Sequence, residues 1–277
     1  MSKPVFKIRN LYCGYKENKP ILLIRNLNIE RSKLYFIIGP SGIGKSTFIE
    51  AVGLMNNTIL SKASELLTYS NNVGEDFELL HIWNNGKAGI ENFRKHYFSF
   101  LFQNNFLMPN FTSGENIKFT ALFKSENVQN IGDDIQDLML KVDLDSSFYD
   151  REVAQLSGGQ KQRIAFIRSL IAPFEVLFAD EPTGNLDPIT ARKMMHLLAS
   201  EIKQNGQTVI IVSHDINLAM DFADVIVPIK IFIENNQSLG CIDEEFVVRK
   251  SNDSWQLSSG LQITDIENYL TDVFKVN

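Results

Sequence analysis

The sequence predicts an α/β fold in which parallel strands form the centre of a sheet. Three short apolar runs carry this prediction, at residues 34–38, 176–179 and 208–212, because strands that are apolar on both faces are typical of buried parallel sheets. The runs end, in turn, in a glycine-rich segment, a pair of acids and a Ser-His-Asp triplet. Ligands of open α/β sheets gather at the carboxyl ends of strands. We therefore expect one site to collect these three polar ends.

The glycine-rich segment after the first run matches the G-x-x-x-x-G-K-[ST] pattern of a phosphate-binding loop. Its glycines let successive backbone N–H groups converge on phosphate oxygens at a helix N-terminus. Lys45 can reach the β- and γ-phosphates of a nucleotide, and the hydroxyl of Ser46 can ligate Mg²⁺. The candidate nucleotide-binding residues of this segment are Gly39, Pro40, Ser41, Gly42, Ile43, Gly44, Lys45, Ser46 and Thr47.

The second and third runs supply candidate catalytic groups. Asp180 fits the carboxylate that holds Mg²⁺ through water, and Glu181 fits the base that orients or deprotonates the attacking water. We expect His214, after the third run, to hydrogen-bond the γ-phosphate. A single acid or histidine at a strand end is usually structural. Three strand ends with a phosphate loop, an acid pair and a histidine predict an ATPase instead.

A second candidate anion site lies at the start of a predicted helix. Apolar residues recur at helical spacing over residues 164–171, so the helix begins just before them. An exposed serine and bare backbone N–H groups at such an N-terminus can bind an anion. One nucleotide needs only one phosphate loop, so we expect this site to cap the γ-phosphate of an ATP held by another copy of the chain. Its residues are Ser157, Gly158, Gly159 and Gln160.

The composition excludes several other classes of protein. The 277 residues are 44% hydrophobic, enough for the core of one large or two small domains. A net charge of -6 argues against a nucleic-acid-binding protein. Only two cysteines, Cys13 and Cys241, exclude a disulfide scaffold. No apolar run approaches the ~20 residues of a membrane-spanning helix, and no signal-type stretch follows Met1. We expect a reduced, cytosolic protein.

With these motifs the sequence resembles the ATP-binding cassette (ABC) ATPases, the nucleotide-binding subunits of ABC transporters. The resemblance covers most of residues 5–230 and includes the family's signature at 156–160 and its D-loop at 185–187. It implies a P-loop NTPase (RecA-like) core with an antiparallel β flank and an inserted α-helical lobe. Segments that alternate loosely over residues 4–29 agree with such a flank. The implied domains are 1–103 with 173–235 for the core and flank, 104–172 for the helical lobe and 236–277 for a C-terminal extension.

The resemblance also implies the roles of single residues. Gln103 looks like the glutamine that links Mg²⁺ and the attacking water to the region that contacts a partner. Tyr15 stands where the family places an aromatic ring that stacks on adenine, and His214 is similar to its switch histidine. The implied cofactors are ATP and Mg²⁺. The implied catalytic residues are Glu181, His214, Gln103 and Lys45, and the implied metal ligands are Ser46, Gln103 and Asp180.

Residues 107–116 and 179–188 resemble the lipoprotein-release, macrolide-export and cell-division group of these ATPases. The implied function is an ATP-binding subunit that hydrolyses ATP at a head-to-tail interface, as a homodimer, and drives a membrane-spanning permease-like subunit. Such a subunit is cytoplasmic and peripheral on the inner face of the membrane. A soluble ABC-type ATPase with a non-membrane partner is the alternative, although the long coiled coil or tandem cassettes typical of that class are missing from the sequence.

Two further classes compete for the phosphate loop. A nucleotide kinase or a GTPase does not need the motif at Ser157, and no N-K-x-D guanine motif is present. A non-hydrolysing regulatory subunit is expected to lose catalytic groups, whereas Lys45, Asp180, Glu181 and His214 are all present.

Three regions outside the motifs also allow predictions. Residues 57–98 are long and rich in asparagine, which favours a solvated loop over a contact arm for a partner. Residues 245–257 predict a hairpin that turns near Asn252 and Asp253. Thr264 and Glu267 resemble a capping box before a helix whose apolar face packs on the chain's own core.

The resemblance gives one more expectation, in the phenylalanine-rich region. The family lines a groove for a cytoplasmic helix of the membrane subunit with the residues that follow the glutamine. We therefore expect an apolar docking groove formed by Phe106, Leu107, Met108 and Phe111.

Overall fold

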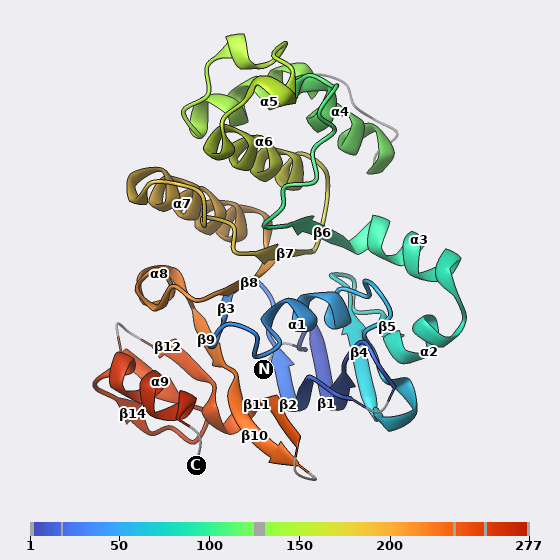
Figure 1. Ribbon diagram of the computed structural model, residues 1–277, viewed down its shortest axis with the longest axis vertical. Coiled ribbons are helices and arrows are strands. Elements are labelled where there is room, and N and C mark those ends of the chain that lie inside the picture. The colour runs from blue at the N-terminus through green and yellow to red at the C-terminus, as the bar shows by residue number, and fades with distance from the viewer. Residues whose placement is uncertain (1–2, 18, 125–130, 235–236, 252–253, 276–277) are drawn as a thin grey trace.

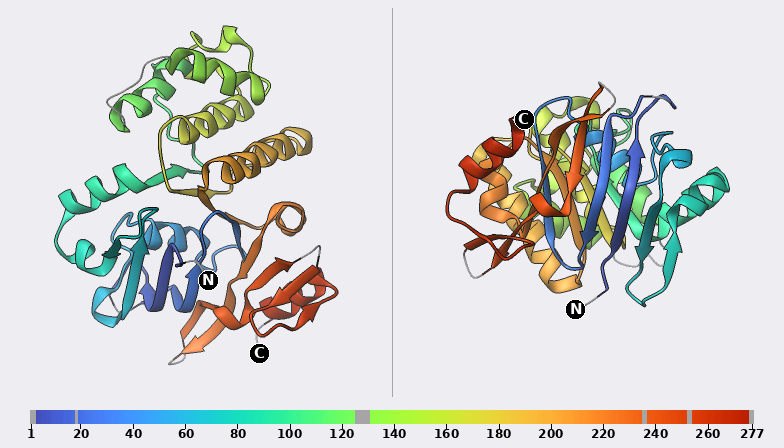
Figure 2. Two further views of the ribbon diagram at one scale, coloured as in Figure 1. Left: turned by 180° about the vertical axis from the view of Figure 1, so that it is seen from behind. Right: turned by 90° about the horizontal axis from the view of Figure 1, so that it is seen from below.

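The computed structural model describes residues 3–17, 19–124, 131–234, 237–251 and 254–275. These residues form two sheets, with strand orders β14-β13-β12-β9-β3-β8-β7-β6 and β10-β11-β2-β1-β4-β5. Helices α4, α5 and α6 form a lobe in which α4 and α5 lie at one end of the molecule, away from both sheets, and α6 lies between them and the larger sheet (Figure 1, Figure 2). The predicted α/β core, β flank and helical lobe are thus all present.

The centre of the larger sheet is parallel, as the apolar runs predict. Its strands are β3 (Leu34–Ile38), β6 (Phe98–Leu101), β7 (Val176–Asp180), β8 (Thr208–Ser213) and β9 (Val225–Pro228). Neighbouring strands run parallel in the order β9-β3-β8-β7-β6. Every residue of β3, β8 and β9 is buried. The strand with the phosphate loop and the strand with the acid pair are therefore separated by the strand that ends before His214.

The smaller sheet is the predicted flank. It comprises β1 (Phe6–Cys13), β2 (Leu22–Ile29), β4 (Leu66–Ser70), β5 (Asp76–Glu78), β10 (Lys230–Glu234) and β11 (Gln237–Asp243). Its pairings are antiparallel except that of β11 with β2, which is parallel. Helix α1 (Lys45–Val52) lies between the two sheets, because its Phe48 shares one apolar core with Ile24 of β2 and Val212 of β8.

The opposite face of the larger sheet is covered by helices. These are α6 (Gly158–Leu170), α7 (Pro188–Asn205) and α8 (Ile216–Phe222), which share a second apolar core with β3, β7 and β8. Helices α4 (Ser113–Lys124) and α5 (Ile131–Lys141) complete the lobe. Short 3₁₀ helices occur at Ser61–Ala63, Ser146–Phe148, Val153–Gln155 and Glu244–Phe246. Within the described ranges, no helix is both long and apolar enough to cross a membrane.

The prediction of a solvated loop over residues 57–98 is wrong. This region forms β4, β5, α2 (Leu79–Asn84) and α3 (Lys87–Tyr97). The buried ring of Tyr69 lies 5.3 Å from the ring centroids of both Phe6 and Phe93. The asparagine pairs of this region lie at turns or at the end of α2, whereas aromatic side chains such as Tyr69 and Phe93 complete the core.

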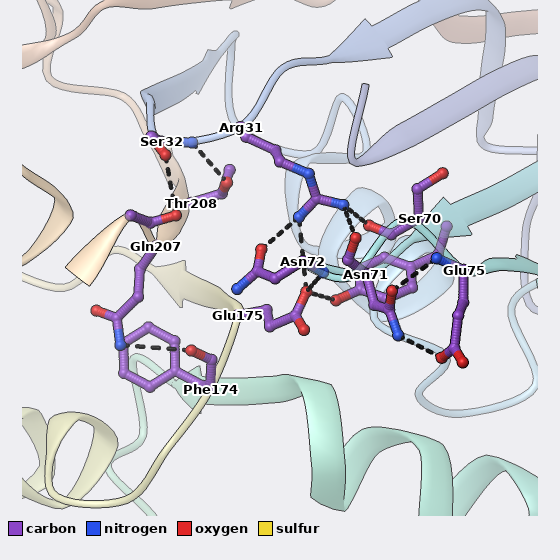
Figure 3. A network of polar contacts seen from close by, with 12 residues as sticks. Arg31, Ser32, Ser70, Asn71, Asn72, Glu75, Phe174, Glu175, Gln207 and Thr208 are labelled. Carbon is purple, nitrogen blue, oxygen red and sulfur yellow. Dashed lines mark hydrogen bonds and ion pairs between the residues drawn. The ribbon is translucent and has the colours of Figure 1, made fainter. Parts of the chain in front are cut away.

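Polar contacts brace the amino ends of the core strands against the flank (Figure 3). Glu175, just before β7, accepts hydrogen bonds from the hydroxyl of Tyr69 at 2.6 Å and from the backbone N–H of Asn72 at 2.9 Å. Arg31, between β2 and β3, lies 3.6 Å from the same carboxylate and also donates to the carbonyl oxygens of Ser70 and Asn71. This network therefore fixes the end of the sheet opposite the carboxyl ends of the strands.

The C-terminal region extends the larger sheet. Strands β12 (Val248–Ser251) and β13 (Ser254–Leu257) pair antiparallel as predicted, β14 (Gln262–Ile263) follows, and the expected turn at Asn252 and Asp253 lies outside the described residues. Helix α9 (Ile266–Phe274) buries Ile266, Leu270 and Val273, which confirms that its apolar face packs on the core.

The predicted cap of this helix is wrong by one residue. The side chain of Asp265 accepts from the backbone N–H of Asn268, in place of a capping box between Thr264 and Glu267. The division into domains 1–103 with 173–235, 104–172 and 236–277 stays a prediction.

Candidate nucleotide-hydrolysis site

A cleft of about 490 Å³ lies at the carboxyl ends of β3, β7 and β8. It collects the three predicted strand ends in one place. The signature residues 157–160 do not line it, and Gly39, Pro40 and Ile43 belong to the loop without lining it. The residues that line the cleft are Tyr15, Ile21, Ser41, Gly42, Gly44, Lys45, Ser46, Thr47, Gln103, Asp180, Glu181 and His214.

The phosphate loop ends where α1 begins. Gly44, the N-cap residue, has φ 111, a conformation that an L side chain rarely adopts. No side chain of the described residues caps α1 there, so the N–H groups of its first turn can meet an anion. A Cβ on Gly240 of β11 would clash with the carbonyl oxygen of Ile43. The sequence reasoning missed Gly240, which lets the flank support the loop at close approach.

The side chain of Lys45 is held by backbone carbonyl groups of the phosphate loop. Its Nζ donates to the carbonyl oxygens of Gly39 at 2.8 Å and Pro40 at 3.0 Å. Burial lowers the pKa of Lys45, and the charges of Glu181 and Asp180 oppose that shift. An ammonium group that is partly desolvated gains from an anionic phosphate, which would replace these two carbonyl acceptors.

Asp180 and Ser46 form the candidate metal site. Burial is the main cause that raises the pKa of Asp180; the charge of Glu181 adds to it, and a hydrogen bond from Ser46 opposes it. A carboxylate beside a hydroxyl is the oxygen donor set that Mg²⁺ prefers. Across the described ranges, no group of three or more His, Cys, Asp or Glu side chains could hold a metal ion. The oxygen donors of Asp180 and Ser46 would fit a Mg²⁺ ion, which would supply positive charge beside the phosphates of a nucleotide.

Glu181 is fixed by two kinds of contact. Nδ1 of His214 lies 2.9 Å from Oε1 of Glu181, whose side chain is 15% exposed, against 70% for His214. The backbone of Glu181 has φ 48, a left-handed conformation that is strained for this residue type. Its N–H donates to the carbonyl oxygen of Val212, and its carbonyl oxygen accepts from Gly184. His214 thus orients the carboxylate of Glu181. The sequence predicted only a hydrogen bond from His214 to a γ-phosphate and not this contact.

The ring of Tyr15 lies at the edge of the cleft, beside α1. Its hydroxyl donates to Oε2 of Glu50 at 2.7 Å, and 55% of the residue is exposed. Burial of its inner part raises its pKa. The exposed ring is therefore anchored at one end. The sequence reasoning missed Glu50, which anchors the ring, and Ile21, which lines the cleft.

The signature segment caps its own helix. The side chain of Ser157 accepts from the N–H of Gln160 at 3.3 Å, and the side chain of Gln160 accepts from the N–H of Ser157 at 2.9 Å. These two contacts form a capping box, so the prediction of bare N–H groups is wrong for both residues. An anion at this N-terminus would be met by the N–H groups of Gly158 and Gly159.

Gln103 begins a loop that a distant arginine holds. Asn105 and Phe106 have φ 37 and 46, so two successive residues are left-handed. Arg168 of α6 donates to their carbonyl oxygens at 2.6 and 2.7 Å. Sequence reasoning missed Arg168, because no local pattern links residues so far apart in the chain.

The parallel sheet, the phosphate loop and the acid pair in one cleft define a nucleotide-binding α/β ATPase. The family model described as "ABC transporter" matches residues 24–184, and the chain belongs to this family. It is an ABC-type ATPase, as its motifs predict.

Two relatives of similar length are each 34% identical to this chain. The lipoprotein-releasing system ATP-binding protein LolD of Myxococcus xanthus matches over 218 residues, 78% of this chain and 92% of LolD. The ABC transporter ATP-binding protein MJ0796 of Methanocaldococcus jannaschii matches over 226 residues, 78% of this chain and 89% of MJ0796. The macrolide export ATP-binding/permease protein MacB of Vibrio parahaemolyticus is also 34% identical, but only 33% of MacB is covered.

Solved structures show the same fold. The dimeric structure of MJ0796 superposes with a TM-score of 0.66 at 27% identity, covering 80% of this chain and 93% of that one. A post-hydrolysis dimer of MJ0796 bound to ADP and Pi gives a TM-score of 0.66 at 28% identity, with the same coverage.

Proposed function

We propose that this chain hydrolyses ATP with Mg²⁺ at a head-to-tail interface between two of its copies and thereby drives a membrane-spanning permease-like subunit. The cleft carries the proposal, because it unites Lys45, Asp180, Glu181 and His214. The signature residues of the same chain lie outside this cleft, so a second copy is needed to bring them to the nucleotide. The dimeric structures of MJ0796 support such a pairing.

The proposed nucleotide contacts follow the cleft from its edge inward. Tyr15 stacks on the adenine, and the loop N–H groups bind the phosphates. Lys45 leaves the carbonyl oxygens of Gly39 and Pro40 for the β- and γ-phosphates. Ser46, Gln103 and Asp180 would hold Mg²⁺, which would supply positive charge against the negative charge that develops on the phosphates.

Hydrolysis is assigned to the Glu181 and His214 pair. The carboxylate of Glu181 positions the water for in-line attack on the γ-phosphate and accepts its proton. Its contact with Nδ1 of His214 limits the carboxylate to one orientation. The N-terminus of α6 from the second copy closes over the γ-phosphate, so the dimer opens once that phosphate is released.

The membrane partner is proposed to bind beside the loop that follows Gln103. Phe106 and Phe111 are exposed there, whereas Leu107 packs against the chain's own second core. Of the four residues expected in the groove, Phe106 and Phe111 are exposed, and Leu107 and Met108 are half-buried. The names of LolD, a lipoprotein-releasing system ATP-binding protein, and MacB, a macrolide export ATP-binding/permease protein, support a permease-like membrane partner. With such a partner, this chain is proposed to lie on the inner face of the membrane. A non-membrane partner is the alternative.

Mixing two inactive variants tests the head-to-tail site. Ser157→Arg keeps the cleft but blocks the signature, and Lys45→Ala keeps the signature but disables the cleft. Each variant alone should be inactive. Their mixture should form ATP-dependent dimers that each retain one nucleotide, because half of randomly formed dimers are mixed and each has one intact site. ATP-dependent dimers of Ser157→Arg alone, or no nucleotide retained in dimers shown to be mixed, would contradict the proposal.

A further inference from the structure

Gln162 is a buried glutamine of α6 whose side-chain amide bonds entirely to the loop after β7. The residue is 1% exposed. Its Nε2 donates to the carbonyl oxygens of Pro182 at 2.5 Å and Glu181 at 3.4 Å. Its Oε1 accepts from the backbone N–H of Asn185 at 3.0 Å. Because a backbone N–H requires an acceptor, the orientation of the amide is fixed by the chain itself.

These three contacts join two parts of the molecule that serve different nucleotides. The loop from Glu181 to Asn185 contains the proposed base for the ATP in the chain's own cleft. The N-terminus of α6 is proposed to meet the ATP held by the second copy. Gln162 lies in the first turns of that helix, close behind the capping box of Ser157 and Gln160. One buried amide therefore lies between the two ATP sites.

A second contact connects the same two segments. A Cβ built on Gly159 would lie 3.5 Å from the carbonyl oxygen of Asn185 and 3.5 Å from the side chain of Leu186. The first turn of α6 thus rests directly on this loop. Glu181 itself is held at φ 48, a conformation that persists only when its surroundings enforce it. A small displacement of the N-terminus of α6 would therefore also move the backbone of Glu181.

We propose that Gln162 is a positioning residue that couples the two ATP sites of the dimer. In this view, which rests on the proposed function, the γ-phosphate bound by α6 of one chain aligns Glu181 of that same chain through the amide of Gln162. Binding at one site then favours hydrolysis at the other. The two states that the ligand selects are the open and the closed dimer.

Two substitutions separate this coupling from simple packing. Gln162→Met keeps the length of the side chain but leaves the acceptor of Pro182 and the donor of Asn185 without a partner. Gln162→Glu reproduces the donor and acceptor of the amide only when its carboxyl group is protonated. As a carboxylate it is repelled by the two carbonyl oxygens, and burial raises its pKa. Acidification should therefore restore the glutamine pattern in Gln162→Glu and not in Gln162→Met.

Ser169→Ala is the matched control. Ser169 is also a buried polar residue of α6, but its Oγ donates at 2.7 Å to Phe166 of the same helix. Its loss removes a buried hydrogen bond without changing the contacts to the loop. Any effect common to Ser169→Ala and Gln162→Met reflects the stability of the helix.

The experiment measures ATPase rate against ATP concentration, affinity for a fluorescent ATP analogue and the melting temperature. Wild type and Ser169→Ala should hydrolyse ATP with a Hill coefficient well above one. Gln162→Met should keep its affinity for the analogue, lose up to about 10²-fold in kcat as expected for a misplaced catalytic group, and show a Hill coefficient near one. The kcat and Hill coefficient of Gln162→Glu should rise toward wild type as the pH falls.

The outcomes are distinguishable. Wild-type kcat and Hill coefficient in Gln162→Met would overturn the coupling, and so would equal losses in Gln162→Met and Ser169→Ala. If Gln162→Met does not fold, a Gln162→Glu variant that folds but shows no recovery relative to wild type at low pH would overturn it as well. A wild-type chain that neither hydrolyses ATP nor dimerises would refute the proposed function itself, and the coupling with it.

Discussion

Replacing Glu181 with glutamine removes the proposed base and keeps the shape of the cleft. The side chain is 15% exposed and meets Nδ1 of His214 at 2.9 Å. An amide of the same length can keep that contact, but it cannot accept a proton from water. We expect turnover to fall about 10²–10⁴-fold. At about 1.4 kcal/mol per factor of ten, this is a loss of about 3–5 kcal/mol of transition-state stabilisation.

The same substitution should trap the dimer. Glu181 lies next to Asp180 in the cleft, so its loss removes a negative charge that repels the γ-phosphate. ATP binding should therefore hold or strengthen while hydrolysis stops, and a dimer should accumulate on size-exclusion chromatography with ATP. Glu91→Gln, at an exposed glutamate of α3 outside the cleft, is the control and should behave as wild type. A Glu181→Gln variant with the parental rate would remove Glu181 from its role, and one that stays monomeric with ATP would refute the trapped state.

Three further predictions concern the contact between β11 and the phosphate loop, the candidate metal site, and the surface proposed to bind the membrane partner. Gly240→Ala should lower the free energy of unfolding by about 1–3 kcal/mol, because the added methyl group overpacks against the carbonyl oxygen of Ile43. Urea unfolding and nucleotide titration would measure the loss of stability and of nucleotide affinity. Unchanged values would show that Gly240 does not support the phosphate loop. Because burial raises the pKa of Asp180, its carboxylate destabilises the fold at neutral pH and less so as the pH falls through that pKa. Asp180→Asn should therefore raise the melting temperature at neutral pH, with a gain that shrinks on acidification; a constant gain would contradict this origin. Phe111→Asp should abolish co-purification of the membrane partner and leave ATP binding intact, whereas Val73→Asp, an exposed residue of the flank, should change neither; retained co-purification would refute the docking surface.

The parallel core and the position of its cleft were predictable because their signals are local. Each apolar run is one buried strand, and its polar end follows directly in the sequence, as at Asp180 and His214. Parallel strands bring these ends to one edge of the sheet whatever lies between them in the chain. The phosphate loop has the same property, since one continuous segment provides the strand, the loop and the helix.

The prediction for residues 57–98 is wrong for a physical reason. Polar residues outnumber apolar ones there, yet Tyr69 and Phe93 each fill a large volume in the aromatic core. A few aromatic side chains bury more area than several asparagines expose. The cap of α9 shows a related problem, because Thr264 and Asp265 are both good N-cap residues and only the folded helix decides between them.

The supporting residues of the site leave no local pattern in the sequence. Arg168 reaches the loop after Gln103, and Gly240 lies under Ile43, across separations that only tertiary packing closes. Gln162 lies two residues after the signature, but its burial shows only when the loop at Pro182 is in place. The residues that contact a nucleotide are visible in the sequence, whereas the residues that hold them in place are visible only in the fold.

The strand β11 has a consequence for how the molecule is made. It is among the last strands in the chain, yet it pairs with β2 and supports the loop of residues 39–47, which is near the beginning. During synthesis on the ribosome, most of the polypeptide must emerge before β11 can pair with β2 and support this loop. The nucleotide pocket is therefore completed late in synthesis, and a nascent chain cut short before residue 237 would carry the full phosphate-loop sequence on an unsupported loop.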